Sequence, residues 1–516
     1  MNKNHEGQNE VLEGVLAEFA KLAAIPRKSG HEQAVSDFLK SYLSELGFTV
    51  MQDEANNIIA DKKATAGFEK APLTILQGHM DMVCVAEEGY AYDPLKDPIK
   101  LVRTEEYLSA EGTSLGADDG IGVAEAIYIM KTAKDHGPLR LIVTTDEEQS
   151  MKGAIRLSAE HLKDASFLIN CDSENYDELT VGSAGSVDLD FTRELKRVEP
   201  ETSAAWRLEV KGLLGGHSGE RIGDGRGNAI RTLAMILTAL QAKGEVELAS
   251  FAGGKARNAI RTLAMILTAL QAKGEIELAS FEGGKARNAI PNDAAAVFVT
   301  DLPKEEIEAV IKDQQERFKK MYGNVEPQIL VPLTSVEAPQ QVLTAGDARR
   351  LLNLLTILHT GVYAMSTVIP GLVETSANLG VVRMTADEVE VQFFPRSAID
   401  QKLDEFRQYA ETVAELTGFT AHIGTQSPGW KENKDSRLAK IVAETFAEQN
   451  GKPMKVETIH AGLECGWHFR KNPQLDMVSI GVTTKDIHSP KEHLVLATVK
   501  PQVDLIVETL HKIAVL

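Results

Sequence analysis

Histidine and acidic residues end several apolar segments of the sequence. "LTILQGHMD" ends in His79 and Asp81, "LRLIVTTDEE" ends in Glu147 and Glu148, and "SFLINCDSE" carries Asp172. In open α/β sheets, ligands bind beyond the carboxyl ends of the strands. If these apolar segments are neighbouring strands, their terminal side chains are expected to meet at one edge of a sheet.

Two further segments extend this set of side chains. "SLGADDGIG" places Asp118 and Asp119 in a turn flanked by glycines, and "TTKDIHSPKEH" supplies His488 after the apolar segment "DMVSIGV". Each motif alone is common in solvated turns and at strand ends that need no ligand. Their occurrence together, mostly after apolar segments, indicates a single site.

The residue types in this set predict metal binding. Mixed histidine and carboxylate ligands suit zinc, cobalt or manganese, and the lack of cysteine among them argues against a structural zinc site. The set has more members than the three protein ligands that one catalytic zinc ion requires. Two metal ions roughly 3.5–4 Å apart, bridged by one carboxylate and one water or hydroxide, fit the number better.

The segments that carry these residues alternate between strand and helix patterns. Helical spacing covers residues 8–24 and 31–46, and helical segments such as "GIGVAEAIYIMKTAK" then separate the apolar strands. This alternation predicts an α/β fold with a central, mostly parallel sheet. The C-terminal part repeats the pattern with predicted helices near 399–417, 435–450 and 496–513.

The pattern changes from about residue 186. "SVDLDFTRELK" and "AAWRLEVKG" alternate polar and apolar residues, as strands with one solvated face do. A second strand-rich run covers 366–396, and a helix is predicted over 303–321. Because 516 residues are too many for one core, we predict a discontinuous α/β domain over 1–186 and 398–516. An inserted α+β domain is predicted over 187–397.

Composition excludes some classes of partner. The chain is 43% hydrophobic and 25% charged, as globular proteins are, and its net charge of −20 argues against nucleic acid and anionic membranes as partners. The first residues lack the pattern of a signal peptide, and no apolar run is long enough to span a bilayer. Three distant cysteines predict a reducing, cytoplasmic location.

Seven motifs together resemble a known family of enzymes. "LQGHMDMV", "LGADDGIG", "TTDEEQSMKGA", "INCDSE", "GGHSG", "HAGLECG" and "IHSPKEH" occur in this order along the chain. They are similar to motifs of the dinuclear zinc exopeptidases of the aminoacylase and carboxypeptidase superfamily, and most similar to its aminoacyl-histidine dipeptidase branch. The resemblance covers essentially the whole chain. It implies that the inserted domain is a lid and dimerisation domain.

The resemblance implies a role for each candidate ligand. His79 and Asp172 are expected to hold one zinc ion, Glu148 and His488 to hold the other, and Asp118 to bridge both. Cobalt or manganese could substitute. The peptide bond between Asp118 and Asp119 is expected to be cis.

The resemblance also implies the residues that act around the metals. Asp81 is expected to fix the ring of His79, and Glu147 to be the general base that activates a metal-bridging water. His217 of "GGHSG" is expected to stabilise the oxyanion, usually from the partner subunit. The residues expected to contact the substrate are Arg396, which binds its carboxylate, and Asn288, His460 and Glu464.

The implied activity is metal-dependent hydrolysis of dipeptides with free termini, with broad specificity that includes Xaa-His. The expected partners are small peptides and a second subunit in a homodimer. Alternatives are a tripeptidase or an N-acyl amino acid deacylase of the same superfamily. A non-catalytic binder would predict loss of the base or a ligand, and the sequence shows neither loss.

A tandem repeat interrupts the inserted domain. Residues 228–257 and 258–287 differ only at Val246 against Ile276 and at Ala252 against Glu282. Two units are too few for a solenoid, so a tandem duplication of one helix–strand unit, or an assembly artefact, explains them better. The surplus unit could add an edge strand, block the dimer or inactivate the chain. The triplet "NAI" thus occurs three times, and only at Asn288 is it followed by proline, as the family requires.

Overall fold

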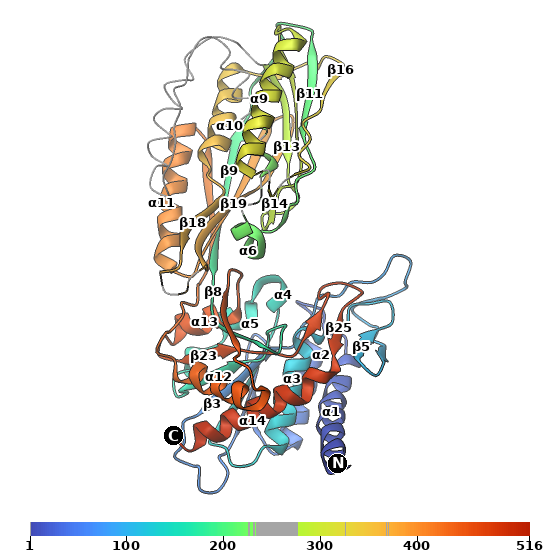
Figure 1. The fold of residues 1–516 in the computed structure, drawn as a ribbon, viewed down its shortest axis with the longest axis vertical. Helices are drawn as coiled ribbons and strands as arrows, with labels where there is room; N and C mark the ends of the chain where they lie inside the picture. The colour runs from blue at the N-terminus through green and yellow to red at the C-terminus, as the bar shows by residue number, and fades with distance from the viewer. Residues whose placement is uncertain are drawn as a thin grey trace. The chain divides into compact units, whose positions relative to one another are not determined.

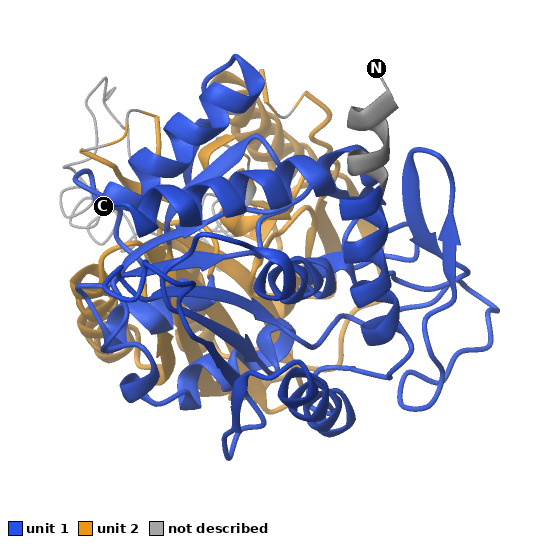
Figure 2. Ribbon diagram, turned by 90° about the horizontal axis from the view of Figure 1, so that it is seen from below, with its two compact units in different colours: residues 1–183, 430–458, 463–516 blue, residues 184–429, 459–462 orange. Residues whose placement is uncertain are grey.

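The computed structural model describes residues 2–224, 226, 228–230, 233, 277–322, 324–325, 327–367, 369 and 371–516. They form two compact units (Figure 2). Unit 1 comprises Met1–Ser183, Trp430–Thr458 and Leu463–Leu516, and unit 2 comprises Ala184–Gly429 and Ile459–Gly462. The first boundary lies close to the predicted residue 186.

The second boundary differs from the predicted one at residue 398. The chain returns to unit 1 at Trp430, because α11 (Asp400–Thr417) and β21 (Thr420–Ser427) belong to unit 2. β21 pairs antiparallel with β9 (Gly185–Glu194), and α11 contacts the same strand. The amphipathic helix after residue 398 therefore covers the sheet of unit 2 instead of starting the return to unit 1.

Unit 1 is built on an eight-stranded sheet in the order β1-β2-β6-β3-β7-β23-β8-β22. The strands β6, β3, β7 and β23 pair in parallel, and the outer pairs β1–β2, β2–β6 and β23–β8 are antiparallel. The predicted mostly parallel sheet is confirmed for this centre. The strands are β1 (Thr49–Gln52), β2 (Ile58–Lys62), β3 (Thr74–His79), β6 (Leu139–Thr144), β7 (Phe167–Asn170), β8 (Glu178–Ser183), β22 (Lys455–Ile459) and β23 (Asp476–Ser479).

Helices cover both faces of this sheet (Figure 1). Alternate residues of a strand point to opposite faces, so Phe167 and Ile169 of β7 join one hydrophobic cluster and Leu168 joins another. The larger cluster is completed by helices α1 (Asn2–Ala23), α2 (Gln33–Glu45), α3 (Ala117–Thr132), α12 (Arg437–Asn450) and α14 (Val499–Ala514). The smaller cluster includes Cys465 of α13 (Glu464–Lys471).

Short elements complete unit 1. A four-stranded sheet has the order β24-β25-β5-β4. Its strands are β4 (Leu101–Arg103), β5 (Tyr107–Ala110), β24 (Thr484–Lys485) and β25 (His493–Val495). The short helices are α4 (Glu147–Ser150), α5 (Lys152–Arg156), η1 (Ala159–His161) and η3 (Leu496–Thr498).

Unit 2 is built on a nine-stranded sheet. Eight of its strands follow the order β16-β11-β15-β13-β19-β20-β9-β21, and the ninth, β18, pairs with β19. Its further strands are β11 (Ala205–Val210), β13 (Glu277–Gly283), β15 (Ala294–Val299), β16 (Leu333–Val336), β18 (Gly361–Met365), β19 (Val373–Met384) and β20 (Glu388–Ser397). Helices α9 (Lys304–Tyr322), α10 (Ala345–Ile357) and α11 lie along one face of the sheet (Figure 1). Two strand pairs lie apart from it, β10 (Arg197–Val198) with β17 (Val342–Leu343) and β12 (Gly216–His217) with β14 (Ala289–Ile290). Helices α6 (Ser218–Arg221) and η2 (Ile222–Asp224) follow β12.

Both copies of the repeat contribute to unit 2. Ile230 and Leu233 of the first copy are fully buried in its core. β13, which comes from the second copy, lies between β15 and β19. The predicted helix over 258–273 and most of that over 228–243 lie outside the described residues. The start of copy one and the strand of copy two therefore both belong to the structure of unit 2.

A chain lacking residues 231–260 is expected to keep a folded unit 2. The deletion joins Ile230 to Arg261, so identical residues follow in the same order and β13 is retained. Because a shorter connection costs less entropy to close, the free energy of unfolding is expected to change by less than about 1 kcal/mol. Urea unfolding and size-exclusion chromatography of both lengths test this. A shortened chain that aggregates or unfolds at much lower urea would contradict it.

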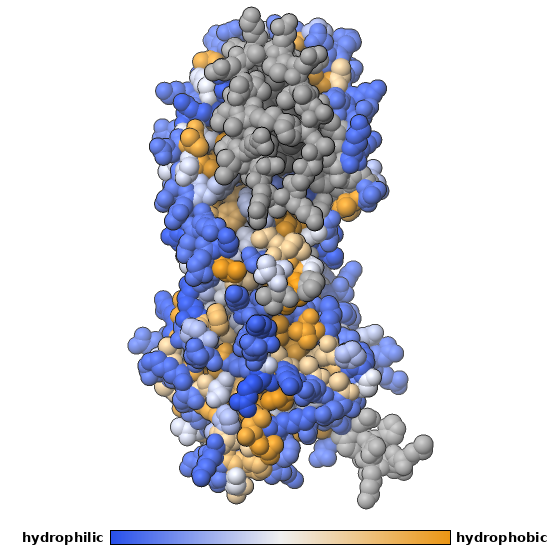
Figure 3. Space-filling view, turned by 60° about the vertical axis from the view of Figure 1, so that its left-hand side comes forward, coloured by the Kyte–Doolittle hydropathy of each residue, from blue (hydrophilic) through white to orange (hydrophobic). Residues whose placement is uncertain are grey.

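One face of the molecule is drawn in Figure 3. Hydrophilic residues predominate on the face drawn in Figure 3, and hydrophobic residues form small groups between them. Exposed hydrophobic side chains such as Leu214, Leu330 and Leu416 come from separate segments, which is normal for globular proteins. No described helix is long and apolar enough to cross a membrane.

Candidate metal centre

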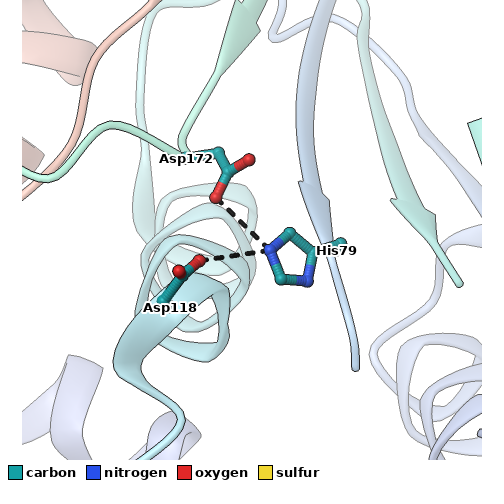
Figure 4. Close-up of side chains that lie close together, drawn as sticks. All are labelled: His79, Asp118 and Asp172. Atoms are coloured by element: carbon teal, nitrogen blue, oxygen red, sulfur yellow. Dashed lines mark hydrogen bonds and ion pairs between the residues drawn. The ribbon is translucent and has the colours of Figure 1, made fainter. Parts of the chain in front are cut away.

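The first group of predicted ligands meets at the ends of β3 and β7 (Figure 4). His79 is the last residue of β3 and is 1% exposed. Its Nε2 lies 3.2 Å from Oδ1 of Asp118, in the first turn of α3, and 3.4 Å from Oδ1 of Asp172, which follows β7. The donor atoms of these three side chains lie within 4.8 Å of one another, close enough for one metal ion.

A second group shares Asp118 with the first. His488 Nε2 lies 3.2 Å from Oδ2 of Asp118 and 2.9 Å from Oε2 of Glu148. Asp118 therefore directs one oxygen toward each histidine. A carboxylate placed between two nitrogen ligands in this way has the geometry that a bridging ligand requires. The structure thus brings together all five predicted ligands, His79, Asp118, Glu148, Asp172 and His488.

The charges of the five ligands fit bound cations. Burial alone would lower the pKa of His79, but the charge of Asp172 and hydrogen bonds to Asp118 and Asp172 raise it well above its usual value. Hydrogen bonds to Asp118 and Glu148 raise the pKa of His488 to about 11. The surrounding carboxylates therefore favour positive charge at both histidines. A divalent cation would supply positive charge at the same place, and imidazole and carboxylate are suitable donors for it.

Asp81 connects the first group to Glu147 and Glu148. Its Oδ1 lies 3.4 Å from Nδ1 of His79, slightly longer than a normal hydrogen bond, and also accepts the backbone N–H of Glu147 at 3.0 Å. Its Oδ2 accepts the backbone N–H of Glu148 at 3.3 Å. Asp81 can therefore orient the His79 ring and the short helix α4 together, as carboxylates behind metal-binding histidines do.

Glu147 lies within the same cluster without pairing to a histidine of the first group. One of its oxygens is within 4.8 Å of donor atoms of His79 and Glu148. Burial raises its pKa well above the usual value; the charge of His79 opposes this, and that of Asp172 adds to it. A carboxyl group with a raised pKa beside a metal centre is suited to accept and return a proton near neutral pH.

Backbone geometry also marks this site. The peptide bond between Asp118 and Asp119 is cis, as expected. Asp146, which precedes Glu147, and His488 have φ values of 54° and 57°, in the left-handed region that non-glycine residues rarely adopt. Strained positions of this kind gather at functional sites. The local backbone is therefore held in place by the surrounding fold.

Two residues around Asp118 were not predicted from the sequence. Gly78 is required because a Cβ atom there would lie 2.1 Å from Oδ2 of Asp119, which accepts the backbone N–H of His79. Arg27 is buried and donates to the carbonyls of Met80, Asp81 and Gly116. Its place in "IPRKSG", between two predicted helices, gave no metal-ligand signal.

Glu464, which was expected to contact the substrate, is fully buried among the described residues. Its Oε2 accepts hydrogen bonds of 2.6 Å from Gln77 Nε2 and from Thr144 Oγ1, while Gln77 Oε1 accepts one from Asn170. These three partners lie near the ends of β3, β6 and β7, just before the predicted ligands. Glu464 therefore fixes the sheet below the metal centre.

Replacing Glu464 by glutamine is expected to flatten part of the pH dependence of stability. Burial raises the pKa of Glu464 to about 7, against about 4.3 for an unfolded glutamate. Between these values the unfolded chain loses the proton first, so ionisation favours unfolding as the pH rises. Relative to the unmodified chain, E464Q should therefore be more stable at pH 8 than at pH 5. Urea unfolding of chelator-treated protein tests this, and an equal difference at both pH values would refute it.

Unit 2 brings together the predicted oxyanion residue His217 and two predicted substrate residues, Asn288 and His460. His217 of β12 faces Ala289 of β14, and Ser218 donates its backbone N–H to the carbonyl of Asn288 at 2.8 Å. A Cβ atom at Gly219 would lie 2.5 Å from the carbonyl oxygen of His460 and 3.0 Å from Cε1 of His217. The "GGHSG" turn therefore packs closely against His460, and only glycine fits there.

His460 is held as a neutral ring. Its Nε2 lies 2.7 Å from Oγ of Ser376. Burial, the nearby charge of Arg396 and that of His217 lower its pKa to about 3, and a backbone hydrogen bond to Val373 opposes this shift. A neutral imidazole can orient a neighbouring hydroxyl group without adding charge to the cluster.

Arg396 is the fourth predicted residue of this group. It lies opposite Ser376 in the β19–β20 pair, is 7% exposed and has its guanidinium 4.8 Å from the centre of the Phe394 ring. Burial lowers its pKa to about 10, and Asp188 opposes this shift, so the group stays charged at neutral pH. Its Nε makes no hydrogen bond to the described residues. Such a guanidinium is suited to bind a carboxylate.

Two of the three "NAI" asparagines lie within the described residues, and Asn258 does not. Asn228 is buried and donates from Nδ2 to the carbonyl of Leu379 at 2.8 Å. Asn288 is exposed, beside the strand of His217. Of these two, only Asn288 presents its side chain to solvent.

Comparison with known proteins places the chain among peptidases. The model of "Peptidase family M20/M25/M40" matches residues 75–512. The chain is 34% identical over 498 residues to the cytosol non-specific dipeptidase of Escherichia coli (strain K12), and the match covers 96% of each protein. The family match includes the segments that supply all five ligands.

Solved structures show the same fold. The aminoacylhistidine dipeptidase of Vibrio alginolyticus superposes with a TM-score of 0.83 at 33% sequence identity, over 97% of this chain and 96% of that one. A tripeptidase from Staphylococcus aureus gives a TM-score of 0.53 at 17% identity, over 98% and 99% of the two chains. The second likeness concerns the fold alone, whereas the first also extends to the sequence.

Proposed function

Since the chain belongs to the peptidase family M20/M25/M40, we propose that it is a dinuclear metal-dependent dipeptidase that acts on dipeptides with free termini, including Xaa-His. The observation that carries this proposal is the placement of Asp118, whose two oxygens each lie 3.2 Å from a different histidine. The two relatives that are 34% and 33% identical to this chain over nearly its whole length are named as dipeptidases, which supports this substrate class.

Zinc is the metal proposed for the centre, with cobalt or manganese as substitutes. His79 and Asp172 would hold one ion, Glu148 and His488 the other, and Asp118 would be shared. Bound zinc ions polarise a carbonyl group and make a nearby water more acidic. The chain itself supplies the orientation of these ligands through Asp81.

Glu147 is proposed as the general base and acid. Its carboxylate takes a proton from the attacking water, and the same oxygen then returns that proton to the nitrogen of the leaving amine. Its raised pKa suits both steps, since the group must gain and lose a proton in each cycle. His217 is proposed to donate a hydrogen bond to the oxyanion, contributed by the partner subunit of a homodimer.

Arg396 is proposed to bind the carboxylate of the substrate, with Asn288 and His460 as further substrate contacts. R396M is expected to lower kcat/KM for a dipeptide by about 10- to 100-fold, because a charged hydrogen bond contributes about 1.5–3 kcal/mol. The same variant should lose little activity on the corresponding dipeptide amide. Arg383, which is 61% exposed at its side chain on β19, offers the control R383M. Equal losses on both substrates would contradict this role.

A substrate panel tests the proposed activity. Unblocked dipeptides, including Xaa-His, are compared with tripeptides and N-acyl amino acids after addition of zinc or cobalt. The proposal predicts preferred cleavage of the unblocked dipeptides. Preference for a tripeptide or an N-acyl amino acid would assign the chain to a sibling activity. We also propose the cytosolic location named for its relative.

A further inference from the structure

A buried carboxylate outside the predicted ligand set holds the loop before Asp118. Glu492 is 2% exposed, and its Oε2 accepts the backbone N–H groups of Leu115 and Gly116 at 2.8 and 3.0 Å. Its Oε1 accepts those of Ala117 and Asp118 at 2.8 and 3.3 Å. One side chain therefore accepts four consecutive backbone N–H groups, from Leu115 to Asp118, in the segment that leads into α3.

This contact joins two distant parts of the chain. Glu492 follows His488 by four residues, whereas Asp118 lies more than three hundred and fifty residues earlier. The side chains of His488 and Asp118 belong to one ligand group, and His488 Nε2 lies 3.2 Å from Asp118 Oδ2. The backbone at His488 has a φ of 57°, which a non-glycine residue rarely adopts. The loop that carries this ligand therefore depends on contacts from its surroundings.

The opposite side of the same loop is held by Arg27. Its Nη2 donates to the carbonyl of Gly116 at 2.5 Å, while Glu492 accepts the N–H of that residue. The positive charge of Arg27 interacts with the carboxylate of Glu492 across this loop. Loss of the carboxylate would leave buried N–H groups without acceptors, which is costly.

We propose that Glu492 is a positioning residue for the metal centre, because it fixes the backbone of Asp118 against the loop that carries His488. Glu492 contacts neither Oδ2 of Asp118 nor Nε2 of His488, the atoms that would bind the metal. Through the backbone of Asp118 it sets the distance between these two ligands of one ion. This inference rests on the proposed function, because it assumes that the Asp118–Glu148–His488 group binds a metal. If Glu492 has this role, the affinity of the site for metal depends on a residue that is not itself a ligand.

The test measures metal binding in the absence of substrate. Chelator-treated full-length protein is titrated with Co²⁺, and binding is followed by visible absorption of the ion. In E492Q the amide nitrogen replaces one carboxylate oxygen. Its own N–H groups would then face two backbone N–H groups, and neither side could accept a hydrogen bond. We expect its Kd for Co²⁺ to rise by about 10- to 100-fold, as for other residues that orient ligands. E492D, which keeps the charge on a shorter side chain, should lie between E492Q and the unmodified protein.

Asp476 provides a matched control. Its carboxylate accepts the backbone N–H groups of Arg437 and Leu438 at the start of α12, away from the predicted ligands. D476N removes a similar helix cap and should leave the Kd for Co²⁺ unchanged. Equal Co²⁺ binding by E492Q and the unmodified protein, or equal weakening in D476N, would overturn the proposal. If E492Q does not fold, the Kd of E492D for Co²⁺ is compared with that of the unmodified protein instead. An unmodified protein that binds no Co²⁺ would refute the proposed function rather than the role of Glu492.

Discussion

Replacement of Glu147 by glutamine is expected to lower kcat for an unblocked dipeptide by about 10²- to 10⁴-fold, the range that general acid–base catalysis contributes. Glutamine has nearly the same shape but cannot accept the proton of the attacking water. It also leaves the Asp81 contact intact, since that contact uses the backbone N–H of residue 147. Metal affinity should therefore change little, because Glu147 is not one of the five proposed ligands.

Two measurements separate the loss of the base from loss of the metal. Steady-state kinetics gives kcat and KM, and elemental analysis gives the metal bound per chain. Glu160, whose side chain is 73% exposed, offers the control E160Q, which should match the unmodified protein in both. The role of Glu147 would be refuted by near-normal kcat in E147Q. A parallel loss of metal would assign Glu147 to the ligand set instead.

Replacement of Asp118 by asparagine is expected to weaken metal binding by more than about 100-fold, beyond the effect of residues that only orient ligands. Asparagine has one oxygen, so it cannot serve both His79 and His488, whose Nε2 atoms face different oxygens of Asp118. Activity should fall to the background level. In addition, the stabilisation that metal gives to the fold should disappear at moderate metal concentration.

Thermal and urea unfolding with and without metal measure this second effect. At a metal concentration of about 100 times Kd, the unmodified chain should gain about 2.7 kcal/mol in the free energy of unfolding. D118N should gain little at that concentration. Asp93, whose side chain is 43% exposed in a loop, provides the control D93N, with a normal response. A normal metal response in D118N would contradict the bridging role.

A set of candidate ligands was predictable because each candidate follows a local pattern. Apolar strands such as β3, β6 and β7 are visible in the sequence, and parallel strands end at one edge of their sheet. His79, Glu148 and Asp172 therefore converge once the fold class is known. The choice of five ligands from the larger set, and the separate assignment of Glu147 as the base, came from the resemblance to a family and not from spacing.

The supporting residues were not predictable in the same way. Arg27 and Glu492 act on backbone groups of distant segments, and nothing in the sequence indicates which carbonyl or N–H group a side chain will meet. Glu464 was expected to contact substrate because it lies in "HAGLECG". Whether that motif presents its glutamate to solvent or to the sheet depends on how α13 packs, which single-sequence patterns do not determine.

The domain boundary illustrates a related limit. α11 was expected from its helical spacing, but an amphipathic helix can cover either of two sheets equally well. The pairing of β21 with β9 decides that it belongs to unit 2. α10 was not expected, although Thr344 caps its start by accepting the backbone N–H of Asp347.

A dipeptidase that requires two metal ions must lose its activity when both are removed. Hydrolysis of an unblocked Xaa-His dipeptide by chelator-treated protein during titration with Zn²⁺ measures this requirement. We expect no activity at the start and maximal activity when two ions are bound per chain. Full activity in the exhaustively chelated protein, or no cleavage of any unblocked dipeptide when both ions are bound, would contradict this expectation.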